Sequence, residues 1–292
     1  MTPLIRHETL RIAVIQRLEE WLGIHADGTV DPPKLLDQQM DADEQLDQPY
    51  AVFDPFMDLC KRRFLWYYDS YVLAITEAEK NVKESEPFKK MPFEGAGNSM
   101  DGKFNYPELR RRLNLIRATI DSETERWADE GRVLQQIESG IAVNLQRQFE
   151  QIIESYKRND SVTLDIELVD ENPFVWQITY FGRPMTQLDG GMFKIIMCVS
   201  PRFPDEQPRA TFETELFHHR VSKDGVFCYF PGNHGDLKSH VQAMIEALED
   251  ESPPYDPRTM VNPEAGKLFW GSVDDKKMYN RRLRRAVQRS TE

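Results

Sequence analysis

Cysteine is scarce in this chain of 292 residues, which has only Cys60, Cys198 and Cys228. The odd count without paired spacing predicts no disulfide framework, and no cysteine and histidine pattern has metal-site spacing. We therefore expect no metal and no cofactor. A chain without disulfides is expected in a reducing compartment, the cytoplasm, the nucleus or both.

Long hydrophobic runs are also missing. No apolar run approaches the ~20 residues that a helix needs to cross a bilayer. The opening stretch MTPLIRHETLRIAVIQRLEEWLG carries charges throughout, unlike a signal peptide. The sequence therefore predicts no membrane partner.

Positive charge is in short supply. Lys and Arg total 37 against 49 Asp and Glu, a formal net charge of -12 at pH 7. Phosphate contacts need clustered cations, so this balance predicts no nucleic-acid partner and favours basic or mixed protein surfaces. The one basic run, RRLRRAVQR near the C-terminus, is expected to be the solvated face of a helix.

The first half of the chain has helical patterning. A helix is predicted from Pro3 to Gly23, and another covers roughly 54–84. Asn105 is expected to cap a third helix. Its apolar stripe is Leu109, Leu113, Ile116 and Ile120. We predict that residues 1–138 form an all-helical extension with an acidic loop at 24–52.

Strand patterning begins after Asn159, behind a further helix over about 141–157. Alternating apolar residues predict four strands at 162–169, 174–182, 192–200 and 209–214, joined by short turns. Such an order predicts an antiparallel meander, and helical patterns return after Cys228. The fold class is therefore α+β over 139–292.

Short motifs in fixed order carry a resemblance to a known family. The run WQITYFGRPMTQLDGGMFKIIMCVSPRFPDEQPRATFET, with NPEA further on, resembles the core of ubiquitin-conjugating enzymes, the UBC fold. The resemblance spans roughly residues 141–289. It implies an N-terminal helix, a four-stranded antiparallel meander and C-terminal helices. The matching residues of the run are Trp176, Gly182, Gly190, Gly191, Phe193, Phe203, Pro204, Pro208, Phe212 and Thr214.

The stretch FHHRVSKDGVFCYF, residues 217–230, aligns with the family's His-Pro-Asn motif and catalytic cysteine. The resemblance implies that Cys228 is the nucleophile that carries ubiquitin, or a ubiquitin-like modifier, as a thioester. The thiolate is the reactive form, so an exposed, deprotonable thiol is expected. Cys60, in an aromatic helix, and Cys198, in an apolar strand, are assigned to packing.

Four further residues are interpreted by alignment. Arg220 stands where the family has the Asn linked to the oxyanion, which a guanidinium can also support; alternatively it is a surface residue of a degenerate site. Asp256 falls where an acid prepares the incoming lysine as a general base or electrostatic guide, or else is only a turn residue. His218 is expected to bond the local backbone, and His219, in place of Pro, to face solvent.

The helical half carries a second resemblance. The stretches LIRHETLRIAV, FLWYYDSYVLAI and FNYPELRRRLNLIR resemble the helical C-terminal extension of Use-type ubiquitin-conjugating enzymes. That type is charged by the second, non-classical ubiquitin-activating enzyme. The resemblance implies a chain split from a tandem two-core protein, or a lineage that lost its first core.

Three functions are open at this point. The first is an atypical ubiquitin-conjugating enzyme whose partners are the modifier, an activating enzyme and a ubiquitin ligase. The second is a non-catalytic UBC-fold adaptor that holds ubiquitin or a ligase. The third is a cysteine hydrolase that pairs Cys228 with a nearby histidine. The chain lacks the family's Trp-Ser-Pro loop and has few basic residues at 141–157, so docking to common ligases and the common activating enzyme is not implied.

Overall fold

The computed structural model describes residues 3–32, 55–82, 86–88, 102–157 and 164–292. The chain forms two compact units, Met1–Ser122 and Glu123–Glu292. The long helix α4, Tyr106–Gln136, contains the junction. The predicted domain division at 138/139 stays a prediction, and most of the predicted acidic loop, residues 33–52, lies outside the described residues.

The first unit opens with one continuous helical segment, as predicted. It comprises α1 (Pro3–Glu8), the π-helical η1 (Thr9–Gln16) and α2 (Arg17–Leu22), and Gly23 ends it with a left-handed φ of 64°. The wider π-helical turn was not predicted. It rotates the buried face, so that Ile15 is fully buried while Val14 is only half-buried.

The other helices in the described part of the first unit are α3, Pro55–Glu79, and the start of α4. The predicted cap is confirmed, because the Asn105 Oδ1 accepts a hydrogen bond from the Glu108 N–H at 3.1 Å. The predicted apolar stripe of α4 is confirmed as well. Its four residues are all 0% exposed: Leu109, Leu113, Ile116 and Ile120.

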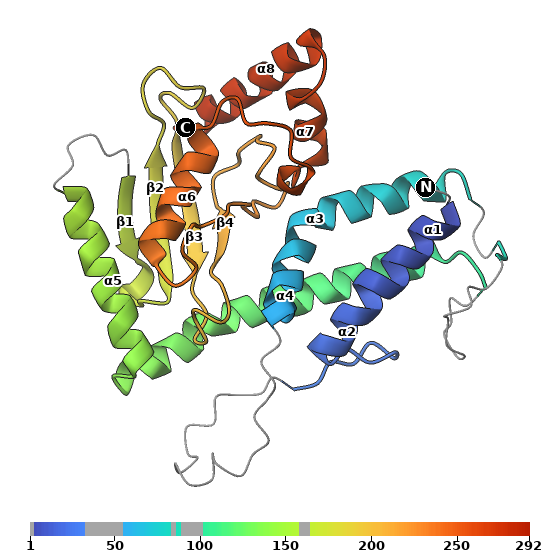
Figure 1. Ribbon diagram of the computed structural model, residues 1–292, viewed down its shortest axis with the longest axis horizontal. Coiled ribbons are helices and arrows are strands. Elements are labelled where there is room, and N and C mark those ends of the chain that lie inside the picture. Colours follow the sequence, from blue (N-terminus) through green and yellow to red (C-terminus); the bar gives the residue numbers. More distant parts are fainter. Residues whose placement is uncertain (1–2, 33–54, 83–85, 89–101, 158–163) are drawn as a thin grey trace, which may run out of the picture. The chain divides into compact units, whose positions relative to one another are not determined.

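The second unit contains the predicted sheet. Helix α5 (Gly140–Lys157) precedes the strands. The strands are β1 (Leu164–Leu168), β2 (Val175–Phe181), β3 (Met192–Cys198) and β4 (Arg209–Phe212). They pair antiparallel in the order β1-β2-β3-β4 (Figure 1), so the α+β meander is confirmed.

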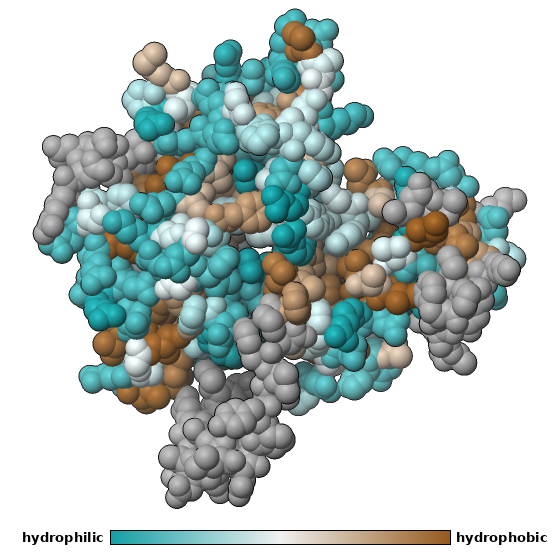
Figure 2. Space-filling view, viewed as in Figure 1, coloured by the Kyte–Doolittle hydropathy of each residue, from teal (hydrophilic) through white to brown (hydrophobic). Residues whose placement is uncertain are grey.

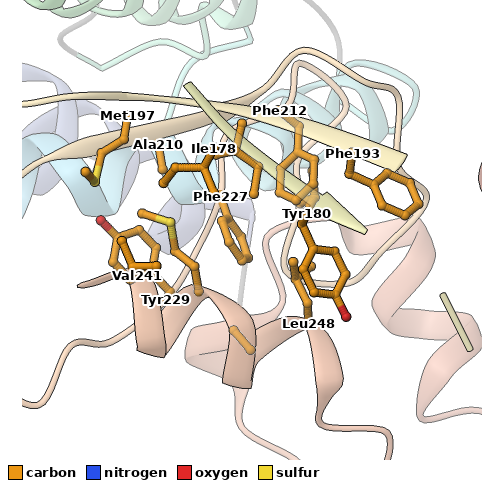
Figure 3. Close-up of a cluster of buried hydrophobic side chains, with 14 of the residues drawn as sticks. Ile178, Tyr180, Phe193, Met197, Ala210, Phe212, Phe227, Tyr229, Val241 and Leu248 are labelled. Atoms are coloured by element: carbon orange, nitrogen blue, oxygen red, sulfur yellow. The ribbon is translucent and has the colours of Figure 1, made fainter. Parts of the chain in front are cut away.

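Three α-helices follow the sheet, namely α6 (Leu237–Glu249), α7 (Pro263–Phe269) and α8 (Val273–Arg289). The core of this unit lies between the sheet and α6, where aromatic side chains meet Val241 and Leu248 (Figure 3). Each fully buried apolar side chain of this kind stabilises the fold by about 1.5–3 kcal/mol.

The basic run is confirmed as a solvated face of α8. Arg281, Arg284 and Arg285 are exposed, while Leu283 and Ala286 are buried beneath them. None of the helices in the described part of the chain is long and apolar enough to cross a membrane.

Candidate active site around Cys228

Cys228 lies at the end of a short hairpin that continues the sheet. Val221 and Phe227 form an antiparallel bridge, and the Cys228 N–H donates to the Arg220 carbonyl at 2.9 Å. Gly225 makes the turn with a φ of +84°. A Cβ at this position would lie 2.4 Å from the Phe212 carbonyl oxygen, so both backbone angle and space require glycine.

The hairpin is fixed to strand β4. The Phe227 N–H donates to the Ala210 carbonyl at 3.0 Å, and the Phe212 N–H donates to the Gly225 carbonyl at 2.8 Å. These bonds hold the hairpin in a defined position. Within the hairpin, the bond from the Cys228 N–H to the Arg220 carbonyl sets these two residues opposite each other.

The thiol of Cys228 is covered. Its side chain is 0% exposed, and its Sγ donates to the Arg258 carbonyl oxygen at 3.7 Å. Arg258 belongs to the segment between α6 and α7, which we call the cover segment, residues 253–262. The prediction of an exposed thiol is therefore wrong for this conformation, because the cover segment lies on the sulfur.

Asp256 organises the cover segment. Its carboxylate caps the short 3-10 helix η4, Pro257–Thr259, by accepting from the Arg258 N–H at 2.9 Å. The same carboxylate accepts hydrogen bonds from the Arg258 guanidinium, from Nε at 3.0 Å and from Nη2 at 2.8 Å. These hydrogen bonds, above all those from the Arg258 guanidinium, hold the pKa of Asp256 below its ordinary value.

Arg220 is half-buried beside this segment. Its Nε is buried and has no hydrogen-bond partner among the described residues. Its positive charge contributes to the lowered pKa of Asp256 and of His218, which places a cation close to both groups. Cys228, Arg220 and Asp256 therefore lie in one region.

His218 bonds the local backbone, because its Nδ1 accepts from the Arg220 N–H at 3.2 Å. Burial lowers its pKa to about 3. The prediction for His219 is wrong: its ring is 0% exposed and stacks on Phe269 with centroids 4.4 Å apart. Burial lowers the pKa of His219 far below its ordinary value.

The backbone of His219 explains why its ring is inside. Its carbonyl accepts hydrogen bonds from the Val261 N–H at 2.9 Å and the Asn262 N–H at 3.1 Å. Asn262 in turn caps α7 by accepting from the Ala265 N–H. The end of the cover segment is thus tied to the hairpin, and the adjoining aromatic residues of α7 enclose the imidazole.

The remaining histidines near Cys228 in the sequence have structural partners. His240 uses both ring nitrogens, with the Tyr229 hydroxyl at 3.1 Å and the His234 carbonyl at 3.2 Å. The His234 Nδ1 lies 3.2 Å from the Gln207 Oε1. Neither arrangement resembles a base held for a cysteine nucleophile, which weakens the hydrolase alternative.

The other cysteines differ from Cys228 in setting. Cys198 lies in β3, where burial raises the pKa of its thiol to about 11. Cys60 is half-buried in α3. Within the described residues, no group of three or more His, Cys, Asp or Glu side chains is placed to hold a metal ion.

Sequence reasoning missed Arg258 and the carbonyl of His219. Arg258 contacts the sulfur through its backbone, which leaves no signature in a side-chain pattern. A local signal was present in Asp256-Pro257, because a capping residue followed by proline marks a helix start. That signal would have predicted η4 but not its position over Cys228.

An antiparallel meander followed by a hairpin that ends in cysteine defines the class of the second unit as a UBC fold. The family model of ubiquitin-conjugating enzymes matches residues 144–230. The wheat (Triticum aestivum) ubiquitin-conjugating enzyme E2 7 is 32% identical over 143 residues, which cover 42% of this chain and 79% of that protein. The chain belongs to the ubiquitin-conjugating enzyme family.

Two further relatives give the same result. Ubiquitin-conjugating enzyme E2 14 of Arabidopsis thaliana is 32% identical over 147 residues, 43% of this chain and 82% of the relative. Ubiquitin-conjugating enzyme E2 2 of Fusarium solani is 28% identical over 127 residues, 42% of this chain and 81% of the relative. The family match lies within the second unit, so the Use-type resemblance of the helical half stays a prediction.

Proposed function

We propose that the chain is an active, atypical ubiquitin-conjugating enzyme that carries ubiquitin or a ubiquitin-like modifier on Cys228. The observation that carries the proposal is the pairing of Cys228 with Arg220 across one hairpin. The backbone bond between the two residues sets Arg220 opposite Cys228, which is the cysteine that aligns with the family nucleophile. Its partners are the modifier, an activating enzyme and a ubiquitin ligase.

Loading is a thioester exchange. The Cys228 thiolate attacks the carbonyl carbon that joins the modifier's C-terminus to a cysteine of the activating enzyme. A new C–S bond forms at Cys228, and the activating enzyme's sulfur leaves as the thiolate. No oxidant or metal takes part in this step.

Discharge uses the two charged neighbours. A lysine amine attacks the thioester, the C–N bond forms, the C–S bond breaks, and the amine's surplus proton leaves to solvent. Arg220 donates to the oxyanion of the tetrahedral intermediate, and loss of such a donor commonly costs about 10²–10³ in rate. Asp256, with its pKa below the ordinary value, is a weak base, so it acts mainly by electrostatic guidance of the lysine.

The cover segment must move for either step. With the Arg258 carbonyl 3.7 Å from Sγ, an acyl group has no room on the sulfur. The described conformation corresponds to a closed form, and the active form requires displacement of residues around Arg258. Such a shift requires a ligand that binds the active form more tightly than the closed form. A partner protein or the modifier itself would be that ligand.

A second candidate is the non-catalytic adaptor. The complete burial of Cys228 favours it, because an adaptor has no use for an accessible thiol. In that case Arg220 and Asp256 would only stabilise the hairpin and the cover segment. The UBC unit would bind ubiquitin or a ligase without a covalent step.

A charging assay tests the proposal. The full chain is incubated with ubiquitin, ATP and each of the two activating enzymes, and the products are separated on a non-reducing gel. We expect a thiol-sensitive adduct that is lost in Cys228→Ala and retained in Cys198→Ala. An adduct that persists in Cys228→Ala, or its absence with both enzymes from a folded chain, contradicts the proposal; the second result favours the adaptor.

A further inference from the structure

The second unit has an open groove away from Cys228, between α5 and the edge strand β1. Its volume is about 800 Å³, within the range of sites that bind ligands. Its floor is apolar and is formed by side chains from α5, β1 and the turn after β1. These residues are Ala142, Val143, Phe149, Ile166, Leu168 and Pro173.

The apolar surface extends beyond the groove to the corner between α4 and α5. Val143, which lines the groove, is 56% exposed, and Ile137 at the corner beyond it is 60% exposed. Figure 2 shows apolar residues gathered over this corner, at the lower left of the view. Exposed apolar surface next to a groove is typical of sites that bind another protein.

The rim of the groove is acidic. Glu138, Glu150, Glu167 and Glu171 line it, and Arg147 is its only cation among the described lining residues. None of the four carboxylates forms an ion pair within the described part of the chain. The rim therefore carries unneutralised negative charge, and it complements a basic partner.

The groove contains an unpaired sheet edge. Strand β1 pairs with β2 only, so within the described residues its other edge lacks a partner strand. An edge strand presents free N–H and C=O groups to a further strand. Its side chains alternate, because Ile166 is buried on one face while Asp165 and Glu167 are exposed on the other.

One wall of the groove is held in place before any partner binds. The turn after β1 is tied to α4 by the Arg132–Asp170 ion pair at 2.9 Å. The Gln135 Nε2 donates to the Glu171 carbonyl at 3.0 Å. Asp170 and Glu171 both have a positive φ, which non-glycine residues rarely adopt. A fixed wall lowers the entropy cost of binding.

We propose that the edge of β1 is a docking site for an extended, basic segment of another protein, which adds to the sheet as a fifth strand. In this arrangement the segment's backbone bonds to the β1 edge. Its apolar side chains lie level with Ile166 over the groove floor, and its alternate basic side chains lie level with Asp165 and Glu167.

The test uses a fluorescein-labelled eight-residue peptide in which lysine and valine alternate. Its binding to the full chain is followed by fluorescence anisotropy at low and at high salt. One control peptide has the same composition in the repeated order Lys-Lys-Val-Val, and a second is N-methylated at alternate amides. We expect both control peptides to bind at least roughly tenfold more weakly than the alternating peptide. The reordered peptide cannot alternate its side chains, and the N-methylated peptide lacks N–H groups that would bond the β1 edge.

Matched variants locate the binding. We expect Glu150→Lys with Glu167→Lys to weaken the alternating peptide roughly tenfold, since it reverses two rim charges. The double variant Asp205→Lys with Glu213→Lys changes net charge equally at exposed positions outside the groove, and should bind within about twofold of the parent chain. Hydrogen exchange should show protection of the β1 amides by the peptide.

Three results would overturn the proposal. Equal binding of the scrambled or N-methylated peptide would mean non-specific attraction to an acidic chain. An equal loss of affinity for the alternating peptide in both double variants would also mean non-specific attraction to an acidic chain. A dimer in light scattering that only the groove variant dissociates would place a second copy of this chain on the edge instead.

Discussion

At the scale of single residues, the site depends on neighbours across one hairpin. Cys228 and Arg220 are paired through the backbone, and the neighbouring His218 and His219 are buried. His219 occupies the position of the family's proline, and it contributes a carbonyl that holds the cover segment. An imidazole can take this position because Phe269 of α7 and the following Trp270 pack against its ring.

The first residue-scale prediction concerns pH. The pKa of buried His219 lies far below the 6.5 of an unfolded chain. Below pH 6.5 the unfolded state binds a proton that the folded state does not, so stability falls as pH falls. Between pH 7.0 and 5.5, the unfolding free energy should fall by about 1.3 kcal/mol less in His219→Phe than in the parent chain. Urea unfolding at both values measures this.

His25 provides the contrasting case. Its pKa is raised by a hydrogen bond from its ring to Asp31, the opposite direction to His219. His25→Gln should therefore not reduce the pH dependence. If the parent and His219→Phe lose equal stability between the two pH values, the buried, neutral state assigned to His219 is incorrect.

The second residue-scale prediction concerns the hairpin turn. Gly225→Ala forces a positive φ on alanine and drives a Cβ against the Phe212 carbonyl. We expect a loss of at least about 2 kcal/mol in unfolding free energy. Gly235→Ala is the matched control, because its Cβ would meet only ordinary contacts. Equal stability of the two variants by urea unfolding would contradict the turn geometry.

At the scale of elements, the cover segment contacts the buried thiol of Cys228. Its single 3-10 turn is stabilised by Asp256, which caps η4 and pairs with Arg258. The carbonyl that reaches Cys228 belongs to the same turn. Loosening the turn should therefore expose the sulfur without disturbing the hairpin.

This gives an element-scale prediction for Asp256→Ala. Loss of a helix cap costs about 1 kcal/mol, which shifts a local opening equilibrium about fivefold. Alkylation of Cys228 by iodoacetamide, followed by peptide mass spectrometry, should accelerate by that factor. Asp274→Ala, which removes an exposed ion pair on α8, should leave the rate unchanged. An unchanged rate in Asp256→Ala would mean that another element covers the thiol.

The elements themselves were largely predictable, and the reason is local. Alternation of Leu164, Ile166 and Leu168 marks a strand by itself, and Asn105 with its apolar stripe marks a helix. The covering of Cys228 was not predictable, because it depends on Arg258, thirty positions further along the chain. Long-range packing of an irregular segment leaves no periodic pattern in the sequence.

At the scale of the whole molecule, the chain combines a UBC-fold unit with a helical unit. The motifs of the UBC-fold unit were recognisable because their order and spacing are fixed by the fold. The acidic balance of the chain agrees with a partner of basic character at the β1 groove. The choice of activating enzyme in the proposed reaction depends on surfaces that a core motif does not encode.

The central claim is that Cys228 holds the modifier, and a protection experiment on charged chain tests it most directly. The full chain is charged with ubiquitin, alkylated at neutral pH, reduced and digested, and the alkylated fraction of each cysteine is compared with that of uncharged chain. The account predicts that Cys228 is protected in proportion to the adduct, while Cys60 and Cys198 are unchanged. Protection of Cys60 or Cys198 in place of Cys228 would contradict it.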